Sequence, residues 1–192
     1  MVRAVISSIR ILDGGDAEAF HALRLHGLRS APEAFGSSYE EERELGIDEV
    51  RRRLDDRPNA AFGAFADNVL VGVAAFAMNT KVKQRHKGLL WGVFVDKDWR
   101  GHNLGKRLTE TVIDYARVHV DTLHATVMAT NISARALYLG LGFTVFGFEK
   151  DALRFNGQSY YDELLRLDLR QPTLTAVDIH LRKEFVQTSP LT

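Results

Sequence analysis

The 192-residue sequence contains no cysteine and only four prolines, and it carries no formal net charge. Without cysteine, the chain has no disulfide, no thiolate metal site and no cysteine nucleophile. The 25 basic and 25 acidic residues lack the basic excess that a nucleic-acid binder usually shows. No stretch approaches the roughly 20 apolar residues of a membrane helix, and residues 1–10 lack the apolar core of a signal peptide. We therefore expect a cytoplasmic protein that binds neither nucleic acid nor membrane and holds no metal.

The composition that is present is typical of a soluble globular protein, with 45% hydrophobic and 26% charged residues. A chain of this length can bury a substantial core within one domain. The periodic pattern of apolar residues ends near Arg170, and Pro172 begins a stretch of low periodicity. The sequence therefore predicts one domain over residues 3–170 and a C-terminal tail over residues 171–192.

Hydrophobic periodicity predicts the order strand, two helices and three antiparallel strands in the first half of the chain. Strands are expected at 6–12, 60–66, 69–77 and 88–95, and helices from an Asp16 cap to about Arg29 and from Asp48 to before Pro58. An acidic run at residues 40–44 follows a loop at 35–39.

The second half continues with a helix, a strand, a short helix and a hairpin. The expected helices contain Leu104–Ala116 and 133–141, and the expected strands are 123–127, 143–155 and 159–169. Gly142 stands where a helix commonly ends in a left-handed residue, and Asn156-Gly157 is a strong hairpin signal. The sequence predicts an α/β (α+β) fold, with a mixed, mostly antiparallel sheet of six to seven strands flanked by about four helices.

The segment from Trp91 to Leu108, WGVFVDKDWRGHNLGKRL, has the pattern of an anion-binding turn. An apolar strand ends at Val95, and a polar turn with Gly101 and Gly105 leads into an amphipathic helix. The unpaired N–H groups and the dipole at a helix start suit a pyrophosphate. Cationic residues nearby add positive charge: Arg100, Lys106 and Arg107.

Other phosphate-binding motifs fit this segment less well. Gly101 and Gly105 are separated by three residues rather than the four of a P-loop, and the dinucleotide motif G-x-G-x-x-G is absent. A glycine-containing loop that merely connects strand to helix explains the spacing about as well.

The same segment resembles the signature of the GNAT superfamily, the Gcn5-related N-acetyltransferases, written Arg/Gln-x-x-Gly-x-Gly/Ala. Arg100 and Gly105 match it, and Asn103 replaces the middle glycine. A second segment, Asn131 to Phe143, closely resembles the family's N-x-x-A-x-x-L-Y-x-x-x-G-F. The loop at 31–42 and the hairpin at 152–165 are also similar to parts of bacterial members. The resemblance covers residues 3–170 and implies the GNAT fold.

The resemblance implies that acetyl-CoA is the co-substrate and assigns residues to it. Backbone amides from His102 to Lys106 would hold the pyrophosphate, and the strand backbone at Phe94 and Val95 would pair with the pantetheine amides. The Val95 N–H would also donate to the thioester oxygen. The full set implied for acetyl-CoA is Phe94, Val95, Arg100, His102, Asn103, Leu104, Gly105, Lys106, Asn131 and Ala134. Asn131 also suits the N-cap of the short helix that follows it.

Tyr138 is the candidate catalytic residue, as a general acid that protonates the departing thiolate. The alternative is an ordinary core tyrosine on an amphipathic helix. No side-chain base stands out: Glu40, Glu41, His86 and His124 are candidates, and a bound water or an amine that enters neutral would remove the need for one. Tyr39 and Glu40 are expected in the acceptor pocket.

The sequence thus predicts an N-acetyltransferase in which a primary amine attacks acetyl-CoA directly. The amine would belong to a small molecule or to a protein N-terminus. The alternative is an acyl-CoA-binding sensor or partner domain with weak catalysis. A homodimer is an open option, and the acceptor, the acyl chain preference and the role of the tail are not fixed by the sequence.

Overall fold

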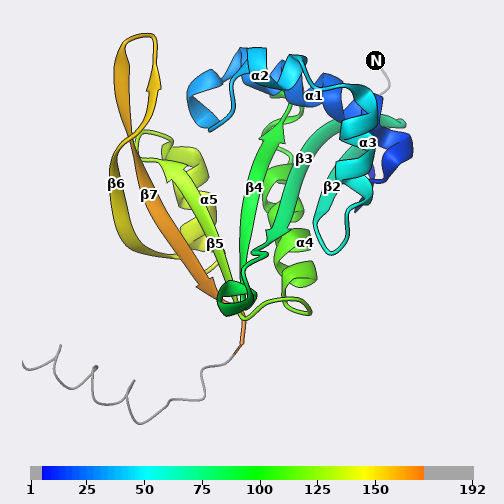
Figure 1. Cartoon of the computed structure of the whole chain (residues 1–192). Coiled ribbons are helices and arrows are strands. Elements are labelled where there is room, and N and C mark those ends of the chain that lie inside the picture. Colours follow the sequence, from blue (N-terminus) through cyan, green and yellow to red (C-terminus); the bar gives the residue numbers. More distant parts are fainter. Residues whose placement is uncertain (1–5, 171–192) are drawn as a thin grey trace, which may run out of the picture.

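The computed structural model describes residues 6–170, which form a single seven-stranded sheet with helices on both faces (Figure 1). The strand order is β1-β2-β3-β4-β5-β7-β6. The strands are β1 (Ile6–Ile11), β2 (Ala60–Ala66), β3 (Val69–Met78), β4 (Lys87–Val95), β5 (Thr122–Met128), β6 (Thr144–Phe155) and β7 (Gln158–Asp168). The α-helices are α1 (Ala17–Ser30), α2 (Tyr39–Arg43), α3 (Ile47–Asp55), α4 (Leu104–Ala116) and α5 (Ile132–Gly140).

The core consists of two apolar layers, one on each face of the sheet. On one face, Leu108 and Val112 of α4 pack against Phe76 and Leu123. On the other face, the buried side chains come from α1, α3 and the central strands, and they include Leu23, Leu54, Val73 and Phe94. Strands β2 and β3 are buried almost throughout, as expected for strands covered on both faces.

The sheet opens between β4 and β5, its single parallel pair of strands. These two strands pair only at Lys87–Thr122, Gly88–Leu123 and Leu89–His124, and they then diverge toward their C-terminal ends (Figure 1). A bulge strengthens the divergence, because Gly92 and Val93 of β4 lie opposite the single residue Ala74 of β3. Gly92 has a φ of +65°, which a residue without a Cβ adopts without strain. The divergence leaves room for a ligand between the two halves of the sheet.

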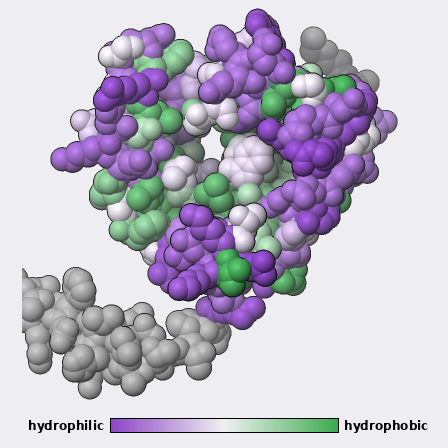
Figure 2. Space-filling model, viewed as in Figure 1, coloured by the Kyte–Doolittle hydropathy of each residue, from purple (hydrophilic) through white to green (hydrophobic). Residues whose placement is uncertain are grey.

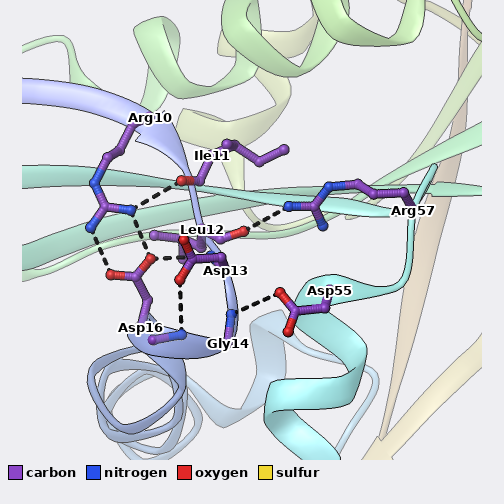
Figure 3. A network of polar contacts seen from close by, with 9 residues as sticks. Arg10, Ile11, Leu12, Asp13, Gly14, Asp16, Asp55 and Arg57 are labelled. Carbon is purple, nitrogen blue, oxygen red and sulfur yellow. Dashed lines mark hydrogen bonds and ion pairs between the residues drawn. The ribbon is translucent and has the colours of Figure 1, made fainter.

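A polar network fixes the turn from β1 into α1 (Figure 3). Arg10 donates to both carboxylate oxygens of Asp16 at 2.7 Å, and the Gly14 N–H donates to Asp55 at the end of α3 at 2.9 Å. Arg57 donates to the Leu12 carbonyl at 3.1 Å. The network therefore ties α1 and α3 to the sheet edge and fixes the helices that cover one side of the opening.

The expected order of elements is confirmed, with strand and helix boundaries that agree to within one or two residues. The acidic run, for which the sequence predicted no element, forms most of α2, which begins with a capping box between Ser38 and Glu41. One local expectation is wrong. Asp16 makes no side-chain cap on α1, because its carboxylate binds Arg10 instead. The predicted tail at 171–192 lies outside the described residues, and no described helix is long and apolar enough to cross a membrane.

Candidate active site

A large cleft runs along the opening between β4 and β5 and has a volume of about 920 Å³. It brings together the C-terminal part of β4, the start of α4, the start of α5 and the loop after α1. Nine of the ten residues that the resemblance assigns to acetyl-CoA line it: Phe94, Val95, Arg100, Asn103, Leu104, Gly105, Lys106, Asn131 and Ala134. The side chain of the tenth, His102, is exposed, and its Nδ1 lies 3.1 Å from the Arg100 carbonyl oxygen.

The turn at the start of α4 has the geometry of an anion site. Gly101 and Asn103 adopt left-handed backbone angles, with φ of +81° and +58°. The Asn103 side chain does not cap the helix, and the first turn of α4 contains no acidic residue. Its leading N–H groups therefore face the cleft with the positive end of the helix dipole. Arg100 lies at the same end, where its Nε donates to the Val95 carbonyl at 3.1 Å.

The free edge of β4 forms the wall of the cleft. Beyond Leu89, β4 pairs only with β3, so its other edge has no strand partner. Val93, Phe94 and Val95 line the cleft in succession. Backbone N–H and C=O groups at an unpaired strand edge can pair with an extended ligand that carries amide groups. At this edge, the family resemblance implies that the pantetheine amides would pair with the strand and that the Val95 N–H would donate to the thioester oxygen.

An inner cavity of about 330 Å³ adjoins the cleft and reaches Tyr138. The two spaces share residues of β4, β5 and α5, including Val93, Met128, Asn131 and Ala134. Asn131 caps α5, because its Oδ1 accepts from the Ala134 N–H at 3.1 Å, as the sequence predicted. The inner cavity is therefore the place where the end of a ligand in the cleft would meet the side chains of α5.

Tyr138 is almost fully buried, and its hydroxyl makes no hydrogen bond with the described residues. Burial raises the pKa of Tyr138 to about 12, because a phenolate would be poorly solvated there. Its ring packs against Phe143, with centroids 5.7 Å apart. Tyr138 is thus a core residue whose protonated phenol lies at the wall of the inner cavity, and its role as a general acid stays a prediction.

The predicted acceptor residues lie in a neighbouring pocket of about 490 Å³ between α2 and the β6–β7 hairpin. Tyr39 and Glu40 line it together with Tyr160 from β7. This pocket shares Phe35, Gly36 and Ser37 with the inner cavity. Figure 2 shows the molecule hollowed on this face, between the β6–β7 hairpin and β4. An acceptor can therefore reach the inner cavity through this pocket.

The four candidate bases do not line the inner cavity. Glu40 lines the outer pocket, and Glu41 closes the capping box with Ser38, which lowers the pKa of its carboxyl. His124 is half-buried on β5, where burial, then Lys87 and Arg166, lower the pKa of its imidazole. Among the described residues that line the inner cavity, none is a carboxylate or a histidine. Within residues 6–170, the walls of the inner cavity therefore offer no side-chain base beside Tyr138.

Sequence reasoning missed Arg24, which lines the inner cavity from α1. It is buried, and burial lowers the pKa of its guanidinium against the opposing effect of Glu42. One signal was present: Arg24 shares the apolar face of its helix with Phe20 and Leu28, which are four residues away on either side. Trp91 also lines the inner cavity, with its ring 5.9 Å from the Arg24 guanidinium.

Comparison with known proteins agrees with this geometry. The model of the Acetyltransferase (GNAT) family matches residues 25–143, which include the turn at α4 and the whole of α5. N-alpha-acetyltransferase 30 of Saccharomyces cerevisiae is 31% identical over 77 residues. That match spans 40% of this chain and 44% of the yeast protein, less than half the length of either.

Solved acetyltransferases share the fold. The structure of yncA, a putative acetyltransferase from Salmonella typhimurium with its cofactor acetyl-CoA, superposes with a TM-score of 0.76 at 22% identity and covers 86% of this chain and 95% of its own. Ribosomal-protein-alanine N-acetyltransferase from Brucella melitensis gives a TM-score of 0.74 at 21% identity, with 84% and 99% covered. Together with the family match over most of the domain, these likenesses identify the chain as a member of the GNAT acetyltransferase family.

Proposed function

We propose that the protein transfers an acetyl group from acetyl-CoA to a primary amine. One observation carries the proposal: a cleft and the inner cavity that adjoins it lead from an uncapped helix start at α4, along the free edge of β4, to the buried phenol of Tyr138. This arrangement offers an anion site, a strand edge for amides and a proton donor in the order that an acyl-CoA would need. Relatives named as N-acetyltransferases support the same chemistry.

Each part of the site would have its own role in the reaction. The N–H groups at the start of α4 hold the pyrophosphate, and the β4 edge aligns the thioester at the inner cavity. The amine nitrogen forms a bond to the thioester carbon while the Val95 N–H stabilises the oxyanion. The C–S bond then breaks with its electron pair on sulfur, and Tyr138 supplies the proton that the thiolate takes up.

Proton balance is completed by the acceptor amine. It loses one proton on forming the amide, and Tyr138 regains one from solvent. Because no described base lines the inner cavity, the amine enters in its neutral form or loses its proton to water. Activity should therefore rise with pH as the fraction of neutral amine grows.

Calorimetric titration of acetyl-CoA into the full-length protein, followed by a thiol-release assay with an amine panel, tests the proposal. We expect one site of micromolar strength or better, with ATP and dephospho-CoA as weaker controls, and release of CoA with at least one amine. The panel should include small primary amines and peptides with a free N-terminus. Tight acetyl-CoA binding without any amine-dependent thiol release would replace the enzyme with an acyl-CoA-binding sensor or partner domain.

A further inference from the structure

Arg24 is a buried cation at the junction of two cavities. Its side chain is only 6% exposed, and it lines both the inner cavity and a smaller cavity of about 230 Å³ beneath α1 and α3. Its Nη2 donates to Glu42 and to Ser37, each at 3.3 Å. The guanidinium lies over the Phe35 ring at 4.7 Å and near the Trp91 ring at 5.9 Å. These contacts hold the group in place next to the reaction centre.

One nitrogen of this guanidinium is left without a partner. Nη1 is buried and makes no hydrogen bond with any residue in the described range 6–170. A buried donor on a charged group without an acceptor is unfavourable, so such a group usually marks a missing partner. The planar fork of arginine matches the paired oxygens of a carboxylate or a phosphate, and a carboxylate is the one that a small amine commonly carries.

The charges around the inner cavity point to the same partner. Arg24 is the sole formally charged residue among the described residues that line it, and Glu42 lines the smaller cavity instead. The other walls combine apolar side chains, such as Leu89 and Met128, with uncharged polar groups. An acceptor beside the thioester would therefore meet one cation, no anion and an otherwise uncharged surface.

We propose that Arg24 binds a carboxylate of the acceptor, so that the substrate is an amino acid or a similar small amine that carries a carboxylate. The inference rests on the proposed acetyl transfer and limits the class of amine that serves as the acceptor. A protein N-terminus presents a neutral carbonyl at the corresponding position, which would satisfy Nη1 less strongly. Arg24 acts here as a specificity residue and takes no part in the transfer of protons.

The first test compares matched acceptors with the wild-type protein. Leucine and methionine are compared with their amides and with 3-methylbutylamine, which is leucine without its carboxylate. Thiol release is expressed per concentration of neutral amine, because the amine pKa differs across the set. We expect kcat/KM for the free acids to exceed that for the amides by about 10- to 100-fold, the range of a charge-assisted hydrogen bond. Equal values for acids and amides would overturn the inference and leave acetyl transfer intact.

The second test removes the guanidinium. Arg24→Gln should abolish the preference for acids, while Arg52→Gln, an exposed arginine paired with Glu49 on α3, should keep it. Acetyl-CoA affinity by calorimetry should stay unchanged in both variants, which separates loss of specificity from loss of fold. If Arg24→Gln does not fold, Arg24→Lys keeps the charge beside Glu42 but lacks the fork, and a reduced preference is expected. A full preference in a folded Arg24 variant would overturn the inference, whereas failure of every amine despite acetyl-CoA binding would overturn the proposed function itself.

Discussion

At the scale of single residues, Tyr138 combines a structural and a chemical position. Its ring belongs to the core, and its hydroxyl has no partner in the described structure. Replacement of Tyr138 by Phe keeps the ring and removes the proton donor. We expect kcat to fall about 10²- to 10⁴-fold, the usual contribution of a general acid. Acetyl-CoA affinity by calorimetry should change less than twofold, and an unchanged kcat would remove Tyr138 from the mechanism.

The raised pKa of Tyr138 also determines the alkaline side of the wild-type pH profile. A phenol acts as an acid only while it is protonated, and burial holds the pKa of Tyr138 near 12. The rate should therefore rise as the amine loses its proton and then stay level up to about pH 10.5. A phenol with an unshifted pKa near 10 would already be mostly deprotonated at that pH and could no longer act as an acid. The kcat measured from pH 7 to 10.5 checks this, and a descending limb centred near pH 10 would contradict it.

Sequence reasoning at this scale succeeded where a local motif fixes a residue. Asn131, Tyr138 and Gly142 adopt the cap, the helix face and the left-handed end that their spacing predicts. Arg24 was not predicted as a site residue, because its partners Glu42 and Trp91 come from distant segments that only the folded sheet brings together. A motif records local geometry, whereas a pocket depends on contacts between segments far apart in the chain.

At the scale of elements, the turn into α4 depends on a left-handed asparagine. Asn103 stands where the family motif has glycine, and its φ of +58° shows how it replaces that residue. We expect Asn103→Gly to leave acetyl-CoA affinity nearly unchanged. Asn103→Val should lower stability by roughly 1–2 kcal/mol, because a β-branched residue is strained in this conformation. It should also weaken acetyl-CoA binding, because the amides at the helix start would move.

Denaturant unfolding and calorimetry on both Asn103 variants measure these two effects separately. If Asn103→Val bound acetyl-CoA as tightly as wild type, the turn would not be the pyrophosphate site.

The length of the elements was predictable from periodicity, since apolar side chains recur along α4 and alternate along β5. The short α2 was not, because its 5 residues are too few to show an apolar period, although the capping box at Ser38 and Glu41 is a local sequence signal.

At the scale of the whole molecule, the order of elements followed from the sequence, but the opening of the sheet did not. The divergence of β4 and β5 after three residue pairs depends on the bulge at Gly92 and on how α4 and α5 pack beneath each strand. Neither feature has a periodic signal. The cleft is thus a property of the assembled sheet, and its residues come from segments as far apart in the chain as Ala31 and Tyr160.

A ligand in this cleft replaces the missing strand contacts and should join the two halves of the sheet. At 100 times its dissociation constant, acetyl-CoA should stabilise the fold by about 2.7 kcal/mol. A domain of this size then gains roughly 5–10 °C in Tm.

Binding of acetyl-CoA should slow amide hydrogen exchange most at 90–95 of β4, at 100–106 and at 125–128 of β5, because their amides flank the opening. Strands β2 and β3, which are already paired on both edges, serve as the internal control. Protection confined to α3 would instead place the ligand in the smaller cavity beneath that helix, and acetyl-CoA would then not bridge β4 and β5.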